Sequence, residues 1–153
     1  MAKRYFLVLG LTLAAMVGAI VVFGVGSRVF FDLPSLGLVV ASAALMGFAA
    51  HSPREVGRSY RLALSDRGGS LEELEQAAAY FDGLVRYLAC GGAIGVLTGV
   101  VAMLVALQDK ASVGRGLALG LLSVLYAVLL IEVVGVPFRT AIRKRLAGLA
   151  RLP

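Results

Sequence analysis

Two apolar stretches near the end of the chain limit what it can fold into. The first covers 87–107, the second covers 116–137, and only QDKASVGR separates them. A helix of about 20 residues, at about 1.5 Å rise per residue, crosses the hydrocarbon core of a bilayer. Each stretch therefore predicts a membrane-spanning helix, and the short connection predicts that the two helices form an antiparallel hairpin.

The composition also indicates a membrane protein. Of the 153 residues, 59% are hydrophobic, which is too many for a soluble domain. The net charge of +6 could suit a nucleic-acid-binding protein, but the charges lie between apolar runs, which favours anionic lipid as the partner. The single Cys90 excludes an intrachain disulfide, and one His without nearby Cys argues against a zinc site. We therefore expect no metal and no nucleic-acid partner.

Two further apolar runs predict two more spans. Residues 5–26 follow a basic start, as in a signal peptide, but the run is longer than a signal core and favours a retained helix. The helix expected over 34–62 begins with a second span, which Asp32 and Ser35 are placed to cap and which leaves the bilayer near His51. With helices over 70–107 and 115–151, the fold class is all-α: a polytopic membrane protein with four transmembrane helices in one domain, 1–153.

The one long polar segment, 52–86, predicts a hairpin formed by short helical extensions of the second and third spans. Gly68 and Gly69 indicate its turn, and Ser70 with Glu73 fits a capping box that starts the next helix. One extension is basic and the other acidic, so they could pair or remain two solvated faces. The charged residues concerned are Arg54, Arg58, Arg61, Glu72, Glu73 and Glu75.

The basic residues also predict how the chain is oriented. Twelve of the 15 Lys and Arg residues lie before the first span, within 52–86 or after the fourth span. The positive-inside rule places that side in the cytoplasm, so both termini are expected inside (N-in/C-in). The last segment, FRTAIRKRLAGLARLP, has one apolar and one basic face. It predicts an interfacial helix, or an extension of the fourth span, held by anionic headgroups.

Inside the spans, the informative residues are glycines and one acid. Glycines at four-residue spacing let helix backbones approach closely in lipid, and these are Gly91, Gly95, Gly99, Gly116 and Gly120. Glu132 is the single ionisable group well inside a span, where a carboxylate is costly. It could lie on a proton path, or form an ion pair with Arg86 or with a basic residue after Pro137. The sequence has no nucleophile–base pair and no phosphate-binding loop, so we do not expect an enzyme.

Three stretches resemble the MotA/TolQ/ExbB family of ion-driven membrane motors. GGAIGVLTGVVAML and LLSVLYAVLLIEVVGVP are similar to the third and fourth helices of MotA, the flagellar stator subunit, and FFDLPSLGLVV is similar to the segment entering its second helix. The resemblance implies a homopentamer in the bacterial inner membrane, built around a dimer of a single-span partner resembling MotB, TolR or ExbD. An aspartate of that partner would take up and release ions, and each cycle would turn the pentamer and do mechanical work in the envelope.

The resemblance also assigns positions to the ion pathway in the lumen of the ring. Val96 and Val124 stand where the family most often has hydroxyls, and Val lacks the oxygen that would bind sodium. We therefore expect the transported ion to be H⁺, with no cofactor. The same loss of hydroxyls would suit the alternative, a non-conducting scaffold that keeps the family fold. The full set carried over is Val96, Thr98, Ser123, Val124, Tyr126, Glu132 and Pro137.

The length of the polar segment predicts where the work is done. A flagellar stator carries a large cytoplasmic domain between its second and third helices, and here that region is only 52–86. The resemblance therefore implies a compact motor that acts through a periplasmic partner, as in the TolQ and ExbB systems.

Overall fold

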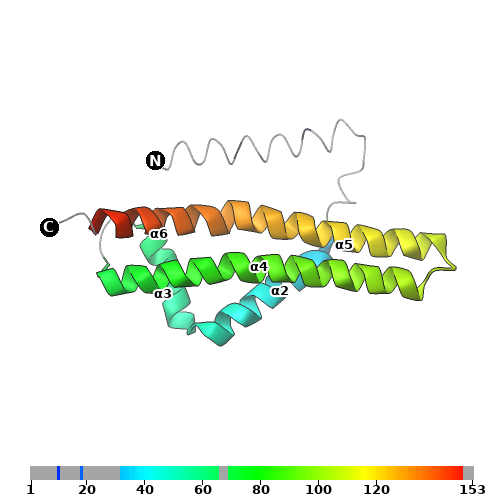
Figure 1. Ribbon diagram of the computed structural model, residues 1–153, viewed down its shortest axis with the longest axis horizontal. Helices are drawn as coiled ribbons and strands as arrows, with labels where there is room; N and C mark the ends of the chain where they lie inside the picture. Colours follow the sequence, from blue (N-terminus) through cyan, green and yellow to red (C-terminus); the bar gives the residue numbers. More distant parts are fainter. Residues whose placement is uncertain (1–9, 11–17, 19–31, 66–68, 150–153) are drawn as a thin grey trace. The chain divides into compact units, whose positions relative to one another are not determined.

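The computed structural model describes residues 10, 18, 32–65 and 69–149, and every regular element in these ranges is a helix. The chain divides into two compact units, Met1–Pro34 and Ser35–Pro153. The span predicted over 5–26 falls in the first unit and, apart from Gly10 and Gly18, lies outside the described residues. Figure 1 shows the described helices, from α2 to α6. They belong almost wholly to the second unit.

Three of the described helices are long and apolar enough to cross a membrane. The first is α2 (Leu33–Ala50) and the second is α4 (Leu71–Val105). The third is the continuous helix Lys110–Leu149, which consists of α5 (Lys110–Leu130), the π-helical turn η2 (Ile131–Gly135) and α6 (Val136–Leu149). The all-helical fold is thus confirmed, with three helices long and apolar enough to span a membrane, whereas the fourth span and the N-in/C-in orientation stay predictions.

The single helix predicted over 34–62 is wrong, because two helices occupy this range. α2 ends at Ala50, and a short helix, α3 (Pro53–Leu64), begins three residues later. The Ser52 amide donates a hydrogen bond to the Glu55 carboxylate (2.9 Å), and the Glu55 amide donates one to the Ser52 hydroxyl (3.4 Å). This capping box, with proline in the first turn, starts a new helix.

The predicted start of the next helix is confirmed. The Ser70 hydroxyl accepts a hydrogen bond from the Glu73 amide (3.3 Å), and the Glu73 carboxylate accepts one from the Ser70 amide (3.1 Å). Gly69 has a φ of +105°, which few residues other than glycine adopt. Its neighbour Gly68 lies outside the described residues. From this start, α4 runs unbroken to Val105, close to the predicted 70–107.

α4 and α5 lie side by side as the hairpin that the sequence predicts (Figure 1). Asp109 caps α5 by accepting a hydrogen bond from the Ala111 amide (3.0 Å). The buried residues in the apolar part of the hairpin are nearly all small. They are Leu88, Gly91, Gly92, Gly95 and Gly99 on α4, and Gly116, Gly120, Ser123 and Ala127 on α5. In lipid, such residues hold helices together through close backbone packing.

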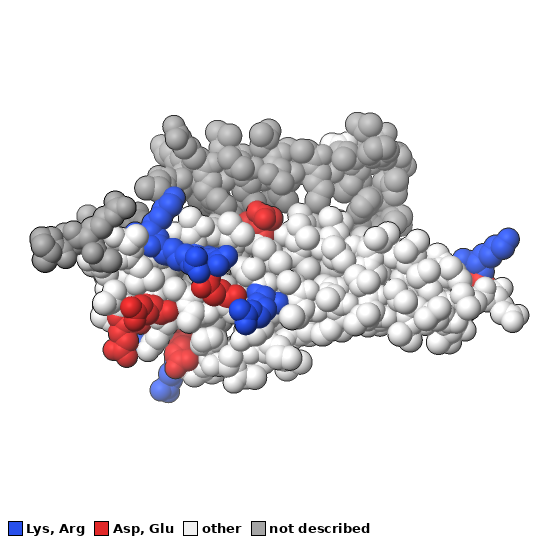
Figure 2. Space-filling model, in the orientation of Figure 1, with Lys and Arg blue, Asp and Glu red and all other residues white. Residues whose placement is uncertain are grey.

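At the other end of the hairpin, three helical segments pack around an aromatic core. We call this cluster the charged end; it consists of α3, residues 71–86 of α4, and α6. The rings of Tyr60, Tyr80, Phe81 and Phe138 contact one another with centroid distances between 5.1 and 5.8 Å. Phe81 is fully buried. On the face shown in Figure 2, charged residues gather over this end and near the α4–α5 turn, with few charges between.

Candidate functional site

The backbones of α4 and α5 touch at their glycines. A Cβ atom added to Gly99 would lie 2.5 Å from the Gly116 carbonyl oxygen and 2.8 Å from the Gly120 amide nitrogen. A Cβ atom added to Gly116 would lie 2.8 Å from the Gly99 oxygen. Real Cβ atoms do not come this close to backbone atoms, so glycine at 99 and 116 is what permits the contact.

One turn of α4 away, a serine takes the place of a glycine in the contact. Ser123 is fully buried, and its side chain occupies the space that a Cβ atom on Gly95 would need. Its hydroxyl donates a hydrogen bond to the Leu119 carbonyl oxygen (2.9 Å) of its own helix. The structure therefore places this predicted lumen hydroxyl inside the α4–α5 contact.

α2 covers one side of the hairpin. A Cβ atom on Gly91 would meet the Ser42 hydroxyl and the Val39 carbonyl oxygen, so Gly91 packs against α2 and not against α5. Ser35, which the sequence places as a helix cap, lies inside α2 and is fully buried. Its hydroxyl donates a hydrogen bond to the Leu119 carbonyl oxygen on α5 (3.3 Å). This serine joins α2 to the hairpin, so its predicted capping role is wrong, whereas Asp32 directly precedes the helix, where a cap residue lies.

Val96 and Val124 lie together on the side of the hairpin away from α2. The Cα atom of Val96 is 3.5 Å from the Cβ position of Gly120. Each valine follows one residue after the facing pair Gly95 and Ser123. Because successive helical residues are about 100° apart and the helices are antiparallel, both side chains turn to the same side. The structure thus brings together the two predicted lumen positions that carry no hydroxyl.

Thr98 and Tyr126 do not join this pair. Each lies two residues after one of the valines, and residues two apart on a helix do not share a face. Thr98 is exposed, and its hydroxyl donates a hydrogen bond to the Ile94 carbonyl oxygen (2.9 Å). Tyr126 is half-buried. The predicted lumen set is therefore divided between two sides of the hairpin.

Glu132 lies in a π-helical turn that sequence reasoning missed. The turn, η2, comes directly before the helix that contains Pro137. Proline lacks an amide hydrogen, and its ring would clash with the carbonyl four residues earlier in a regular α-helix, so a wider turn accommodates it. Pro137 was therefore the residue in the sequence that could have indicated the π-helical turn. Glu132 is exposed, and both of its predicted roles stay predictions.

The basic and acidic extensions meet at one pair. Arg58 Nη1 lies 3.2 Å from Glu73 Oε1, which joins α3 to α4. The other charged residues predicted to pair are exposed: Arg54, Arg61, Glu72 and Glu75. The structure thus brings two of the six together.

A second charge cluster was not predicted. Asp82 on α4 forms ion pairs with Arg139 and with Arg143 (2.7 Å) on α6. Arg145 Nη1 donates hydrogen bonds to the carbonyl oxygens of Leu62 (2.6 Å) and Ser65 (2.9 Å), at the end of α3. Of the two predictions for the final segment, extension of the preceding helix is the one observed. Three of its arginines bind within the chain, and contact with anionic lipid stays a prediction.

Asp82 lies before the apolar part of α4, so its carboxyl group is outside the predicted membrane span. Partial burial by itself raises the pKa of its carboxyl, but the hydrogen bonds from Arg143 and Arg139 outweigh burial and hold the pKa below its ordinary value. A lowered folded-state pKa stabilises the fold at pH values above the unfolded-state pKa, about 4 for Asp. This stabilisation is lost as the pH falls through the lower folded-state pKa.

Asp82→Asn should therefore lower the free energy of unfolding at pH 7. In this variant the free energy of unfolding should also decrease less as the pH falls, because the titrating carboxyl is absent. The loss should not exceed about 1 kcal/mol, because the side chain is 37% exposed and solvent screens the pair. Thermal unfolding in detergent at neutral and acidic pH measures both effects. Glu75→Gln, an exposed change on the same helix, is the control. Equal pH profiles for Asp82→Asn and the unmodified chain would contradict the assignment.

Comparison with known proteins gives no family assignment. No model of a known protein family matches the chain, and no curated protein sequence matches it. Within the described residues, no group of three His, Cys, Asp or Glu side chains could hold a metal ion.

Proposed function

We propose that the chain is a subunit of a proton-driven rotary motor of the bacterial inner membrane, similar to the MotA/TolQ/ExbB family. In this proposal five copies surround two transmembrane helices of a MotB/TolR/ExbD-like partner. The observation that carries it is the α4–α5 hairpin, which α2 covers on one side only. The opposite side presents Val96 and Val124, the positions that the resemblance assigns to the lumen.

The chemistry of this opposite side suits a helix that rotates against it. Val100 and Val128 continue the face of the two valines by one turn each, and Leu117 lies two turns before Val124. Val100, Leu117, Val124 and Val128 are all between 41% and 51% exposed. A wall of aliphatic side chains offers a partner helix no hydrogen bonds that must break as the ring turns. The proton would then travel on the partner's carboxylate and water, because a charge at this depth needs such a carrier.

The charged end supports a compact motor with its output elsewhere. By the positive-inside rule it lies in the cytoplasm, with four spans and both termini inside. Its three helical segments pack on one another and leave no large additional domain within residues 52–86 to engage a rotor. The ion-motive force supplies about 2.3 kcal/mol per charge per 100 mV. The periplasmic part of the partner would then perform the mechanical work.

The assembly is tested by co-expression with a single-span MotB/TolR/ExbD-like protein. Native mass spectrometry should show five copies of this chain with two of the partner, and a stable monomer would overturn the assembly.

In a Cys90→Ser background, Val124→Cys should form a disulfide with a cysteine on the partner helix. Tyr126→Cys, two residues on and on the other side of the hairpin, should not.

The mechanism is tested by proton flux in liposomes that contain the complex. Neutralising the partner's aspartate should abolish the flux, and unchanged flux would overturn the mechanism. Glu132→Gln separates the two roles of that residue: it should impair flux if Glu132 lies on the path, and only lower stability if it forms an ion pair.

A non-conducting scaffold is the second candidate, and one observation favours it. The buried Ser123 hydroxyl is bonded to Leu119, so it does not replace the hydroxyls absent at Val96 and Val124. A scaffold would form the same complex but carry no proton flux. The liposome measurement distinguishes the two candidates.

A further inference from the structure

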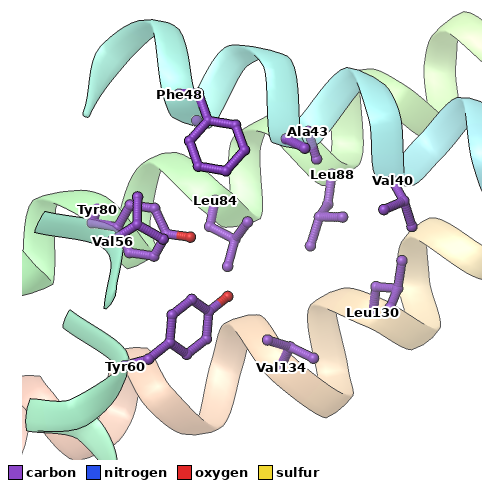
Figure 3. Close-up of a pocket in the computed structure, with 12 residues that line it drawn as sticks. Val40, Ala43, Phe48, Val56, Tyr60, Tyr80, Leu84, Leu88, Leu130 and Val134 are labelled. Atoms are coloured by element: carbon purple, nitrogen blue, oxygen red, sulfur yellow. The ribbon is translucent and has the colours of Figure 1, made fainter. Parts of the chain in front are cut away.

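A pocket opens where α2 leaves the hairpin and α3 turns back. Its volume is about 350 Å³. α2, α3, α4, α5 and η2 all contribute to its wall, and Figure 3 shows their side chains surrounding it. Representative residues are Val40 and Phe48 on α2, Tyr60 on α3, Tyr80 and Leu88 on α4, and Leu130 on α5.

The wall of this pocket is aliphatic and aromatic, with two hydroxyl groups at one end. Figure 3 shows the oxygens of Tyr60 and Tyr80 directed into the space, with Leu88 and Leu130 farther along it. The ring centroids of Tyr60 and Tyr80 lie 5.8 Å apart, so both hydroxyl groups are at the same end of the pocket. The pocket therefore combines a long apolar part with hydrogen-bonding groups at one end.

The pocket has both room and a mouth. Gly47 is buried in its wall, yet a Cβ atom at that position would meet nothing within 4 Å. Val40 and Phe48 at its edge are 44% and 56% exposed, and both lie on α2, which is long and apolar enough to span a membrane. In a bilayer crossed by α2, this mouth would open toward the hydrocarbon. An empty apolar space of this size would forfeit the packing that protein interiors normally keep.

We propose that this pocket holds one acyl chain of a membrane phospholipid, with its ester group beside Tyr60 and Tyr80. The volume lies in the range of small-molecule sites, about 300–1,000 Å³. A second helix is a poor occupant, because a helix with its side chains is about 10–12 Å across. A methylene chain is slender enough, and a phenol hydroxyl can donate a hydrogen bond to an ester oxygen. The pocket lies within one subunit, so the inference does not depend on the proposed assembly.

The test uses the full chain in vesicles of phosphatidylethanolamine and phosphatidylglycerol. A small fraction of the phosphatidylglycerol carries a diazirine at the end of one acyl chain. After illumination, peptide mass spectrometry should find lipid adducts on pocket residues such as Leu88 and Leu130, besides those on the exposed Val101 and Leu121. Absence of adducts on the pocket residues would overturn the proposal.

A variant with a filled pocket can be compared with a matched variant in which the pocket stays open. Gly47→Leu should abolish the adducts on Leu88 and Leu130 and leave those on Val101 and Leu121 unchanged. Gly37→Leu, the same change at an exposed glycine of α2 with open space around it, should alter neither set. If Gly47→Leu does not fold, Ala44→Leu fills the same pocket from one turn earlier. Pocket adducts that persist in the filled variant would overturn the proposal.

Other occupants are distinguished by a crosslinker placed in the wall. Phe48→p-benzoylphenylalanine should crosslink to phospholipid in the same vesicles. Crosslinks to residues 5–26 of the chain, or to a second copy, would show that a helix fills the pocket and would overturn the lipid assignment.

Discussion

Replacing Gly99 by leucine should force α4 and α5 apart and unfold the hairpin. The nearest atoms to a Cβ at this position all belong to backbone: the Gly116 carbonyl oxygen, the Gly120 amide nitrogen and the Gly120 Cα. A side chain can change rotamer to relieve such a contact, but backbone atoms move only if the helix moves. We therefore expect the effect to lie at or above the upper end of overpacking penalties, about 3 kcal/mol.

The free energy of unfolding in mixed micelles, measured by denaturant titration, gives this value. Gly114→Leu is the matched control, because Gly114 lies in α5 with nothing within 4 Å of its Cβ position. That variant should be neutral or slightly more stable, since leucine favours helix over glycine by up to about 1 kcal/mol. Gly99→Ala should fall between the two. If both leucine variants were equally stable, the close backbone contact would be ruled out.

Replacing Phe81 by alanine should loosen the charged end. The ring is fully buried and contacts the rings of Tyr60, Tyr80 and Phe138. Its removal leaves a cavity where α3, α4 and α6 meet, and such truncations cost about 3–5 kcal/mol. Thermal unfolding followed by circular dichroism measures the loss, and limited proteolysis should cut α3 first because it is the shortest of the described α-helices.

Phe48→Ala makes the same chemical change at a side chain that is 56% exposed. The transfer and cavity contributions are both smaller there, so its effect should be well below that of Phe81→Ala. Equal losses for the two variants would mean that the aromatic cluster does not hold the charged end together.

The hairpin could be predicted from the sequence because its causes are local. Apolar length, a short connection and glycines at four-residue spacing each act within one or two helices. The capping box at Ser70 and the turn at Gly69 are local signals too, and the structure shows both. The break at His51 was missed although Ser52 and Glu55 form a capping box of the same kind. There the apolar run before it and the basic stripe after it suggested one continuous helix.

The contacts between distant segments could not be predicted. Asp82 and Arg139 are 57 residues apart, and Ser35 and Leu119 are 84 apart. Nothing near any of these residues in the sequence indicates its partner, because the pairing depends on how the helices cross. The resemblance also assigned to one lumen residues that the hairpin separates: Ser123 turns into the α4–α5 contact, while Val124 beside it stays partly exposed. Which face of the hairpin is covered depends on where α2 lies.

The unbroken course of α4 has a mechanical consequence. Its 35 residues extend about 52 Å at 1.5 Å each, well beyond a hydrocarbon core of about 30 Å. Asp82 forms ion pairs with α6, and Gly99 contacts the backbone of α5, so α4 is held by neighbouring helices at two positions along its length. It therefore has the form of a lever arm: a tilt of about 10° at the membrane would displace a tip about 20 Å away by roughly 3–4 Å. A small tilt of α4 at the membrane would thus produce a larger displacement at the charged end.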